Sequence, residues 1–286
     1  MIRPLPDLLI EPVIRAALAE DLGRAGDVTA RACIPEGARL RAAFAARKPG
    51  VAAGLDCVRL AVRSLGQEAA VTLLLREGEA FDAGAVLAEV DADAHALLAA
   101  ERTALNLLGR LCGIATLTRA HVDAVAGTGA RIADTRKTTP GLRALEKHAV
   151  ACGGGLNHRF GLDDAILIKD NHVAVCGGVG EAVRRARAAA GHLMKIEIEV
   201  DGLEQFDEAL AEGPDVIMLD NFTLPMLRAA VERVKDRSAR PVLEASGGVS
   251  LDTVRSIAET GVDVISVGAL THSAPSLDIG LDALPA

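Results

Sequence analysis

The sequence predicts an α/β protein whose second half is a parallel α/β barrel, and three features of its 286 residues support this class. From about residue 129 onward, short segments rich in Val, Ile and Leu alternate with amphipathic helical segments. Such strands are typical of a parallel sheet that is buried on both faces. Charged and polar residues end nearly every strand, which is where barrel enzymes carry their chemistry.

The first half of the chain combines helices and strands without a regular order. We expect a helix at residues 12–20, strands at 39–47 and 69–76, a second helix at 55–65 and a small β-structure at 77–93. Leucines recur at helical spacing from Ala94 to about Val125. This spacing predicts a long helical region, with a break near Gly113.

Six segments of the second half are predicted strands: ARIADTRK, AILIKDNH, KIEIEV, DVIMLDN, PVLEASGG and VDVISVGA. Amphipathic helices are expected near residues 203–213, 223–235 and 250–261. A doubly wound sheet is the alternative architecture, but its glycine fingerprint should follow the first strand. The glycine-rich segment CGGGLNHRFG precedes a strand instead, so the barrel is favoured.

Composition argues against several classes of partner. The net charge is -8 and no long basic run occurs, which disfavours binding to nucleic acid. The sequence contains no run of about 18 consecutive apolar residues, so it predicts no membrane span. Acidic residues interrupt the N-terminal apolar stretch, so it lacks the pattern of a secretory signal, and we expect a cytoplasmic protein.

Cysteines and most histidines give no sign of a metal site. The five cysteines are odd in number and contain no CxxC pair, so we expect buried, reduced thiols at Cys33, Cys57, Cys112, Cys152 and Cys176. Four histidines show no metal-ligand spacing: His95, His121, His148 and His192.

Cationic residues follow the first two strands of the predicted barrel. Arg136 and Lys137 end the first strand, Lys169 ends the second, and His158 and Arg159 lie in the loop between them. Several cations that share one barrel mouth need an anionic ligand to relieve their repulsion. Because arginine binds carboxylate in a bidentate manner, this set predicts a substrate with several negative charges.

Acidic residues end the third and fourth strands. Glu197 and Glu199 alternate along one face of the third strand, and Asp220 ends the fourth. Such carboxylates suit Mg²⁺, which is usually held by one or two carboxylates plus substrate phosphates. The last two strands end in SGG and VGA, where glycine lets backbone amides approach a phosphate. The residues therefore predict a site for a polyanion, a divalent metal and a phosphate monoester.

The stretch DTRKTTPGLRALEKHAVACGGGLNHRFGLDDAILIKDNH resembles the signature region of quinolinate phosphoribosyltransferases. Further segments are similar to this family in the same order, among them EDLGRAGDVT, ERTALNLLGRLCGIAT, DVIMLDN and LEASGGV. The resemblance extends over nearly the whole chain. It implies an enzyme of de novo NAD biosynthesis that converts quinolinate and phosphoribosyl pyrophosphate to nicotinate mononucleotide, carbon dioxide and pyrophosphate.

The resemblance also implies a role for each matching residue. The carboxylates of quinolinate are expected to bind Arg102, Arg136, His158, Arg159 and Lys169. The expected catalytic residues are Lys137, Lys169, Glu199 and Asp220, of which Glu199 and Asp220 would hold Mg²⁺ partly through the substrate. The substrate phosphate is expected at Ser246, Gly247, Gly248, Val267 and Gly268. Glu199 is favoured over Glu197 as the carboxylate that faces the metal.

The family fold implies an N-terminal α/β sandwich domain at residues 1–115 and an incomplete, six-stranded barrel at 116–270. A C-terminal tail, residues 271–286, would pack back on the first domain. The resemblance further implies a homodimer with shared active sites, or a higher oligomer, in which Arg102 reaches the adjacent subunit.

Two other functions are compatible with parts of the sequence. A Schiff-base aldolase would use a lysine at a barrel strand end, such as Lys169, although such lysines are usually activated in apolar pockets. A non-catalytic or molybdenum-associated paralogue should depart from the site residues of the family. The positions named above show no such departure.

Overall fold

The computed structural model describes residues 2–66 and 68–285, which form two compact units. The described parts of Met1–Arg119, Thr138–Gly154 and Leu270–Ala286 form the first unit, and Ala120–Lys137 with Gly155–Ala269 form the second. Residues 138–154 are expected in the barrel domain from the sequence, whereas the structure groups them with the first unit.

Helix α5 (Arg143–Cys152) explains this difference, because an ion pair ties it to α4 (Ala94–Ala124). The carboxylate of Glu146 is fully buried, and its Oε1 accepts a hydrogen bond from Arg110 Nε at 2.8 Å. Arg110 also donates to the carbonyl oxygen of Thr271 at 2.6 Å. Since a buried carboxylate is stable only with a partner, this contact holds α5 on α4.

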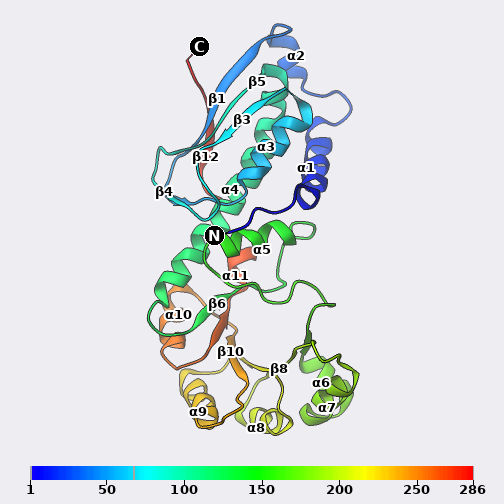
Figure 1. Cartoon of the computed structure of the whole chain (residues 1–286), viewed down its shortest axis with the longest axis vertical. Helices are drawn as coiled ribbons and strands as arrows, with labels where there is room; N and C mark the ends of the chain where they lie inside the picture. The colour runs from blue at the N-terminus through cyan, green and yellow to red at the C-terminus, as the bar shows by residue number, and fades with distance from the viewer. Residues whose placement is uncertain (1, 67, 286) are drawn as a thin grey trace. The chain divides into compact units, whose positions relative to one another are not determined.

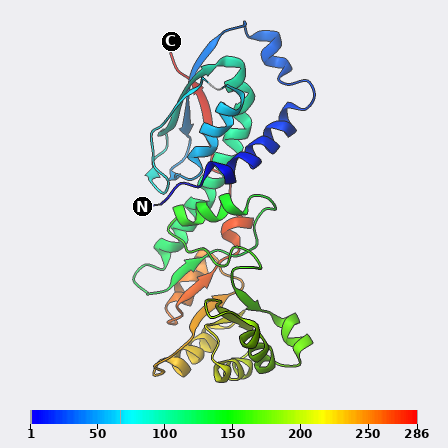
Figure 2. The same ribbon diagram turned by 45° about the vertical axis from the view of Figure 1, so that its right-hand side comes forward.

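A four-stranded antiparallel sheet with the order β12-β1-β5-β3 forms the first unit. Its strands are β1 (Arg39–Ala46), β3 (Ala70–Leu73), β5 (Val86–Asp93) and β12 (Ile279–Ala283). Figure 2 shows helices α1 (Asp7–Leu22) and α3 (Leu55–Leu65) on one side of this sheet. Because β12 pairs with β1, the end of the chain returns to a sheet built from its first third.

Shorter elements complete this unit. They are α2 (Val28–Cys33), the paired strands β2 (Gly50–Val51) and β4 (Ala80–Phe81), and α11 (Ala269–His272). Across the described residues, no helix combines the length and the apolar character that a membrane crossing requires.

Helix α4 runs without interruption from Ala94 to Ala124, so the expected break near Gly113 is wrong. Gly113 makes room for another segment instead, because a Cβ at this position would lie 2.0 Å from the Pro275 carbonyl oxygen. One turn earlier, the Leu277 amide donates to the Gly109 carbonyl oxygen at 2.8 Å. The two glycines therefore let the C-terminal segment pack directly against the backbone of the helix.

The second unit contains a six-stranded parallel sheet with the order β6-β11-β10-β9-β8-β7. Its strands are β6 (Arg131–Ala133), β7 (Ile166–Ile168), β8 (Ile196–Val200), β9 (Val216–Asp220), β10 (Val242–Ser246) and β11 (Val264–Ser266). Helices alternate with the strands (Figure 1): α6 (Asp170–Cys176), α7 (Val179–Ala189), α8 (Leu203–Glu212), α9 (Leu224–Val234) and α10 (Leu251–Ala258). The predicted fold class is confirmed.

Alternation along these strands separates a core face from a polar face. In β8, Ile196, Ile198 and Val200 are buried, and Glu197 and Glu199 project from the opposite face. In the neighbouring strand β9, Ile217 and Leu219 are fully buried, and the alternate residues Met218 and Asp220 line the cavity described below. The polar face consequently gathers carboxylates and hydroxyls from several strands on one side of the sheet.

Candidate active site

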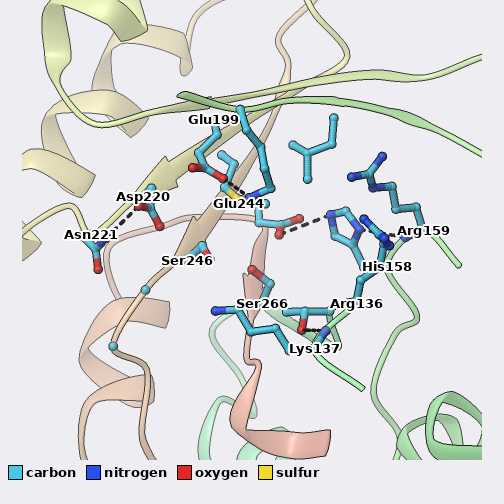
Figure 3. A pocket seen from close by; sticks show the side chains of 16 residues that line it. Arg136, Lys137, His158, Arg159, Glu199, Asp220, Asn221, Glu244, Ser246 and Ser266 are labelled. Atoms are coloured by element: carbon cyan, nitrogen blue, oxygen red, sulfur yellow. Dashed lines mark hydrogen bonds and ion pairs between the residues drawn. The ribbon is translucent and has the colours of Figure 1, made fainter. Parts of the chain in front are cut away.

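The carboxyl ends of the strands in the second unit surround a cavity of about 580 Å³ (Figure 3). Most of the residues expected at the site line it: Arg136, Lys137, His158, Arg159, Lys169, Glu199, Asp220, Ser246, Gly247 and Gly248. His158 and Arg159 lie on one side of the cavity, and Asp220 and Asn221 lie on the other. Cationic and acidic groups thus face the same space.

Two arginines on the cationic side have unsatisfied hydrogen-bond donors. The buried Nε atoms of Arg136 and Arg159 have no hydrogen-bond partner among the described residues. Burial, and then the positive charge of Arg136, lower the pKa of Arg159. The Arg159 side chain is fixed by one bond, from Nη1 to the Ala165 carbonyl oxygen at 3.2 Å. Such a pair favours an anionic ligand, because an anion accepts the free N–H bonds and offsets the repulsion.

His158 is held in one orientation by backbone hydrogen bonds. Its Nδ1 accepts a bond from the Arg159 amide at 2.8 Å, and its own amide donates to Asp134 Oδ1 at 2.8 Å. Because Nδ1 is an acceptor, the neutral ring carries its hydrogen on Nε2. That atom lies 2.9 Å from Glu197 Oε2 and 3.7 Å from Glu244 Oε1.

Glu244 is a buried carboxyl group beside a second carboxyl group. Burial, and then the negative charge of Glu197, raise the pKa of Glu244 to about 7. Two carboxylates that share a buried space cannot both ionise easily, so one keeps its proton to a higher pH. The Glu244 side chain therefore exchanges a proton close to neutrality.

Glu199 and Asp220 provide oxygen ligands on neighbouring strands. Glu199 Oε2 lies 2.6 Å from Lys169 Nζ, and Asp220 Oδ2 accepts a bond from Asn221 Nδ2 at 2.7 Å. The two carboxylates line the same cavity, and Glu199 pairs in register with Met218, two residues before Asp220. Two carboxylates that face a cavity fit Mg²⁺, which completes its coordination with water and substrate phosphate.

The loop after β10 has the backbone shape of a phosphate-binding turn. Gly247 and Gly248 have φ values of 97° and 61°, in the region that favours glycine. A Cβ on Gly247 would lie only 2.2 Å from Asn221 Oδ1, so this position accepts no side chain. Helix α10 begins a few residues later, after its cap Ser250. The amides of this loop therefore precede a helix N-terminus, where anions are favoured.

Three of the expected site residues do not line this cavity. The Val267 side chain is 1% exposed, and its amide donates to the Ala133 carbonyl oxygen at 2.9 Å. This amide extends the pairing of β11 with β6 and is unavailable to a phosphate. Gly268 follows it outside the lining residues, and Arg102 is an exposed residue of α4 in the first unit.

Other residues at the site were not selected from the sequence. Asp134 is fully buried and accepts bonds from the His158 amide and, at 2.7 Å, from Asn157 Nδ2, so it shapes the loop that carries His158. Glu244 and Asn221 also line the cavity. In the sequence, each of these residues lies near the end of a predicted strand, in DTRK, LEASGG or LDN. A position at a strand end does not by itself distinguish a site residue from a structural one.

Comparison with known proteins identifies one family over nearly the whole chain. The N-terminal domain of quinolinate phosphoribosyl transferase matches residues 27–112, and the C-terminal domain of that enzyme matches residues 114–282. The chain is 51% identical over 271 residues to the carboxylating nicotinate-nucleotide pyrophosphorylase of Mycobacterium leprae, covering 94% of this chain and 95% of that protein. It is 44% identical to a probable enzyme of the same name from Bacillus subtilis, covering 96% and 93% of the two chains.

Solved structures agree with this grouping. The nicotinate-nucleotide pyrophosphorylase of Francisella tularensis superposes with a TM-score of 0.93 at 35% identity and covers 99% of each chain. The corresponding protein of Ehrlichia chaffeensis superposes with a TM-score of 0.90 at 38% identity, covering 96% of this chain and 98% of the other.

Proposed function

Because this chain belongs to the quinolinate phosphoribosyltransferase family, we propose that the cavity at its strand ends is the active site. The enzyme is a pentosyltransferase of NAD biosynthesis, similar to the carboxylating nicotinate-nucleotide pyrophosphorylases. It transfers the phosphoribosyl group of phosphoribosyl pyrophosphate to quinolinate. The products are nicotinate mononucleotide, carbon dioxide and pyrophosphate.

One observation carries the assignment of this cavity: two arginines have buried N–H groups without acceptors. Arg136 and Arg159 both line the cavity, and the Nε of each has no hydrogen-bond partner among the residues described. Quinolinate is a dianion, so its two carboxylates supply the missing acceptors and the missing negative charge. Arginine binds carboxylates well because its planar guanidinium group can donate two parallel hydrogen bonds to the two carboxylate oxygens.

The opposite side of the cavity suits phosphoribosyl pyrophosphate. Glu199 and Asp220 would hold Mg²⁺, which, when bound, offsets negative charge on the pyrophosphate group. Lys137 and Lys169 add positive charge on the same cavity. The loop from Ser246 to Gly248 offers a hydroxyl group and backbone amides to the substrate phosphate.

The chemistry needs no covalent nucleophile from the protein. The bond from ribose C1 to pyrophosphate breaks, and the quinolinate nitrogen forms a bond to C1 and becomes a pyridinium. The positive nitrogen stabilises the electron pair left when the adjacent carboxylate departs as carbon dioxide, and that carbon is then protonated. Arg136, Arg159 and His158 orient the pyridine ring, so the protein acts by positioning and electrostatic stabilisation.

A Schiff-base aldolase fits the site poorly. That reaction needs a neutral lysine amine as the nucleophile, usually in an apolar pocket. Lys169 instead forms an ion pair with Glu199 at 2.6 Å, which uses the charged ammonium form. Borohydride trapping with carbonyl substrates should therefore leave the protein unlabelled.

Substrate choice tests the proposed function. We expect strong preference for quinolinate over nicotinate, because nicotinate leaves part of the cationic side unpaired, at a cost of several kcal/mol. Nicotinate mononucleotide formation is measured with phosphoribosyl pyrophosphate, Mg²⁺ and each acid in turn. Arg159→Ala should lose much of this preference, whereas Arg185→Ala, on the exposed side of α7, should keep it. Equal kcat/KM for the two acids would refute the assignment.

We further propose that the enzyme works with Mg²⁺ as a cytoplasmic homodimer. The carboxylate pair supports the metal, and the composition supports the compartment. Support for the dimer comes from Arg102, which is expected at the substrate but is an exposed residue of the first unit, outside the cavity lining.

A further inference from the structure

A separate cluster of ionisable side chains lies within the first unit. Glu77, His148 and Cys152 converge there, although the sequence pattern gave no reason to group them. Glu77 Oε2 lies 3.3 Å from His148 Nε2 and 3.3 Å from Cys152 Sγ. The remaining pair, Cys152 Sγ and His148 Nε2, is 3.5 Å apart. The cluster therefore presents one oxygen, one nitrogen and one sulfur atom at the corners of a nearly regular triangle.

These distances match the edges of a zinc tetrahedron. Zinc binds carboxylate oxygen and imidazole nitrogen at about 2.0–2.2 Å and thiolate sulfur at about 2.3 Å. In a tetrahedron with such bonds, the ligand atoms lie roughly 3.3–3.6 Å apart. An ion can therefore contact the three atoms of Glu77, His148 and Cys152 with little movement of the side chains.

Local structure fixes each of the three ligands. His148 and Cys152 are four residues apart on α5, so their side chains share one face of that helix. Glu77 lies in the turn between β3 and β4, and its carboxylate accepts bonds from the amides of Gly54 at 3.0 Å and Leu55 at 2.8 Å. Hydrogen bonds of this kind orient a ligating carboxylate and are a usual feature of protein metal sites.

An entry path and a free coordination position are both available. Glu77 and Cys152 line a cavity of about 660 Å³ in the first unit, so an ion and its fourth ligand have access. Arg76 and Arg119 also line this cavity, which favours a small anion or water as that ligand. The side chains of Glu77 and His148 are 12% and 10% exposed, which limits competition from solvent.

We propose that Glu77, His148 and Cys152 form a binding site for a divalent transition-metal ion of the zinc class. A thiolate, an imidazole and a carboxylate suit zinc, whereas Mg²⁺ prefers a shell made only of oxygen. Such an ion would link helix α5 to the turn that precedes β4. Its chemistry is distinct from that of Glu199 and Asp220, so the two sites select different ions.

Cobalt absorption tests this site in the intact enzyme, because Co²⁺ bound to a thiolate gives a charge-transfer band that sites without cysteine lack. Titration with Co²⁺ should give this band at one equivalent per chain, and Zn²⁺ should abolish it. The band should disappear in Cys152→Ser. It should persist in the matched control Cys33→Ser, whose thiol is exposed. A wild-type enzyme without the band, or a Cys152→Ser variant that retains it, would overturn the proposal.

A second variant separates metal binding from folding. Glu77→Gln preserves the shape of the side chain and an oxygen acceptor at Oε1 for the Leu55 amide, and it replaces Oε2, which accepts the Gly54 amide, with an NH2 group. It should keep transferase activity with Mg²⁺ but weaken Co²⁺ binding at least about tenfold, because it removes a charged ligand. Zn²⁺ should raise the melting temperature of the wild type and leave that of Glu77→Gln unchanged. If Zn²⁺ shifts neither melting temperature, the cluster is only a hydrogen-bonded contact of the fold and the proposal fails.

Discussion

The imidazole of His158 illustrates how single hydrogen bonds orient a side chain of the proposed active site. The Arg159 amide donates to Nδ1, so the Nε2–H group is directed toward Glu197 and Glu244. Asp134 holds the backbone of the same loop, because it accepts the His158 amide at 2.8 Å. Rotation of the ring would therefore break its contacts with the Arg159 amide and with Glu197, so the fold sets its tautomer.

Glu244 should make the stability of the enzyme depend on pH. Its pKa is raised to about 7 in the folded state, from an ordinary value of 4.5, because of burial and then of the negative charge of Glu197. A carboxyl group whose folded pKa is raised binds its proton more tightly in the folded state, so its contribution to stability falls as pH rises between these two values. Glu244→Gln should therefore gain stability relative to wild type from about pH 5 to about pH 8, by up to roughly 3 kcal/mol.

Urea denaturation of both proteins across this pH range measures the effect. Glu36→Gln, at an exposed turn, is the matched control and should follow the wild-type profile. If the free energies of unfolding of wild type and Glu244→Gln change in parallel with pH, Glu244 titrates in its ordinary range.

Asp220 tests the acidic side of the site. Asp220→Asn keeps the size of the side chain and its contact with Asn221 but removes a charged oxygen ligand. Metal-dependent binding of phosphoribosyl pyrophosphate should weaken by roughly ten- to a hundredfold, or about 1.4–3 kcal/mol. Quinolinate binding should survive, because we assign it to Arg136 and Arg159.

Calorimetry with each substrate distinguishes the two sides. Asp201→Asn, an exposed change just after β8, should bind both substrates like the wild type. Loss of quinolinate binding with retention of the diphosphate would mean that the two sides are assigned in reverse.

At the scale of elements, helix α4 depends on glycine for its packing. Gly113 and Gly109 are one turn apart, and the segment from Pro275 to Leu277 lies against both. Alanine usually stabilises a helix by about 1 kcal/mol relative to glycine. Gly113→Ala should do the opposite and destabilise the protein by about 1–3 kcal/mol, because its Cβ would lie 2.0 Å from a carbonyl oxygen.

Denaturant unfolding of Gly113→Ala and Gly109→Ala provides an internal comparison. Gly109→Ala should lower the free energy of unfolding by less than Gly113→Ala does, because its Cβ would lie 2.8 Å from the nearest atom, the Leu277 oxygen. A Gly113→Ala protein as stable as the wild type would mean that the C-terminal segment does not need this contact.

Patterns within a strand could be predicted from the sequence, whereas contacts between distant segments could not. The alternation in KIEIEV correctly indicated that Glu197 and Glu199 share a face, since the period of a strand is local. The break expected at Gly113 was wrong because a segment more than 150 residues later fills the space beside the glycine. In the same way, His148 and Cys152 carry no signal until Glu77 approaches them in the folded unit.

The residues of the candidate site also separate into those that local sequence predicts and those that depend on contacts between distant segments. Four cations could be selected from the charge at the end of the first strand and in the loop that follows it, and all four line the cavity: Arg136, Lys137, His158 and Arg159. The ion pair of Lys169 with Glu199 was not expected, because the sequence places the two residues at the ends of different strands and gives no distance between them. Val267 was selected as part of a glycine-containing turn, but its amide continues the pairing of β11 with β6. Sequence spacing does not reveal which backbone amides are already hydrogen-bonded within a sheet.

At the scale of the whole molecule, Arg102 raises the question of assembly. It lies in α4 beside the buried residues Leu105 and Leu108, yet its own side chain is exposed. An exposed arginine in this position contacts either solvent or another molecule, such as a second copy of the chain. If it belongs to the substrate site, a two-fold dimer would supply it to the adjacent subunit and create two equivalent shared sites.

Complementation between inactive variants decides this point. Arg102→Ala and Asp220→Ala should each be nearly inactive, because every site in either homodimer lacks one of the two residues. A mixed dimer would contain one site with both residues and one site with neither, if Arg102 acts across the interface. After complete subunit exchange, half of the dimers are mixed and half of their sites are intact, so about a quarter of wild-type activity should return. Mass spectrometry confirms the mixed dimers, and their inactivity would show that Arg102 serves its own chain or only the fold.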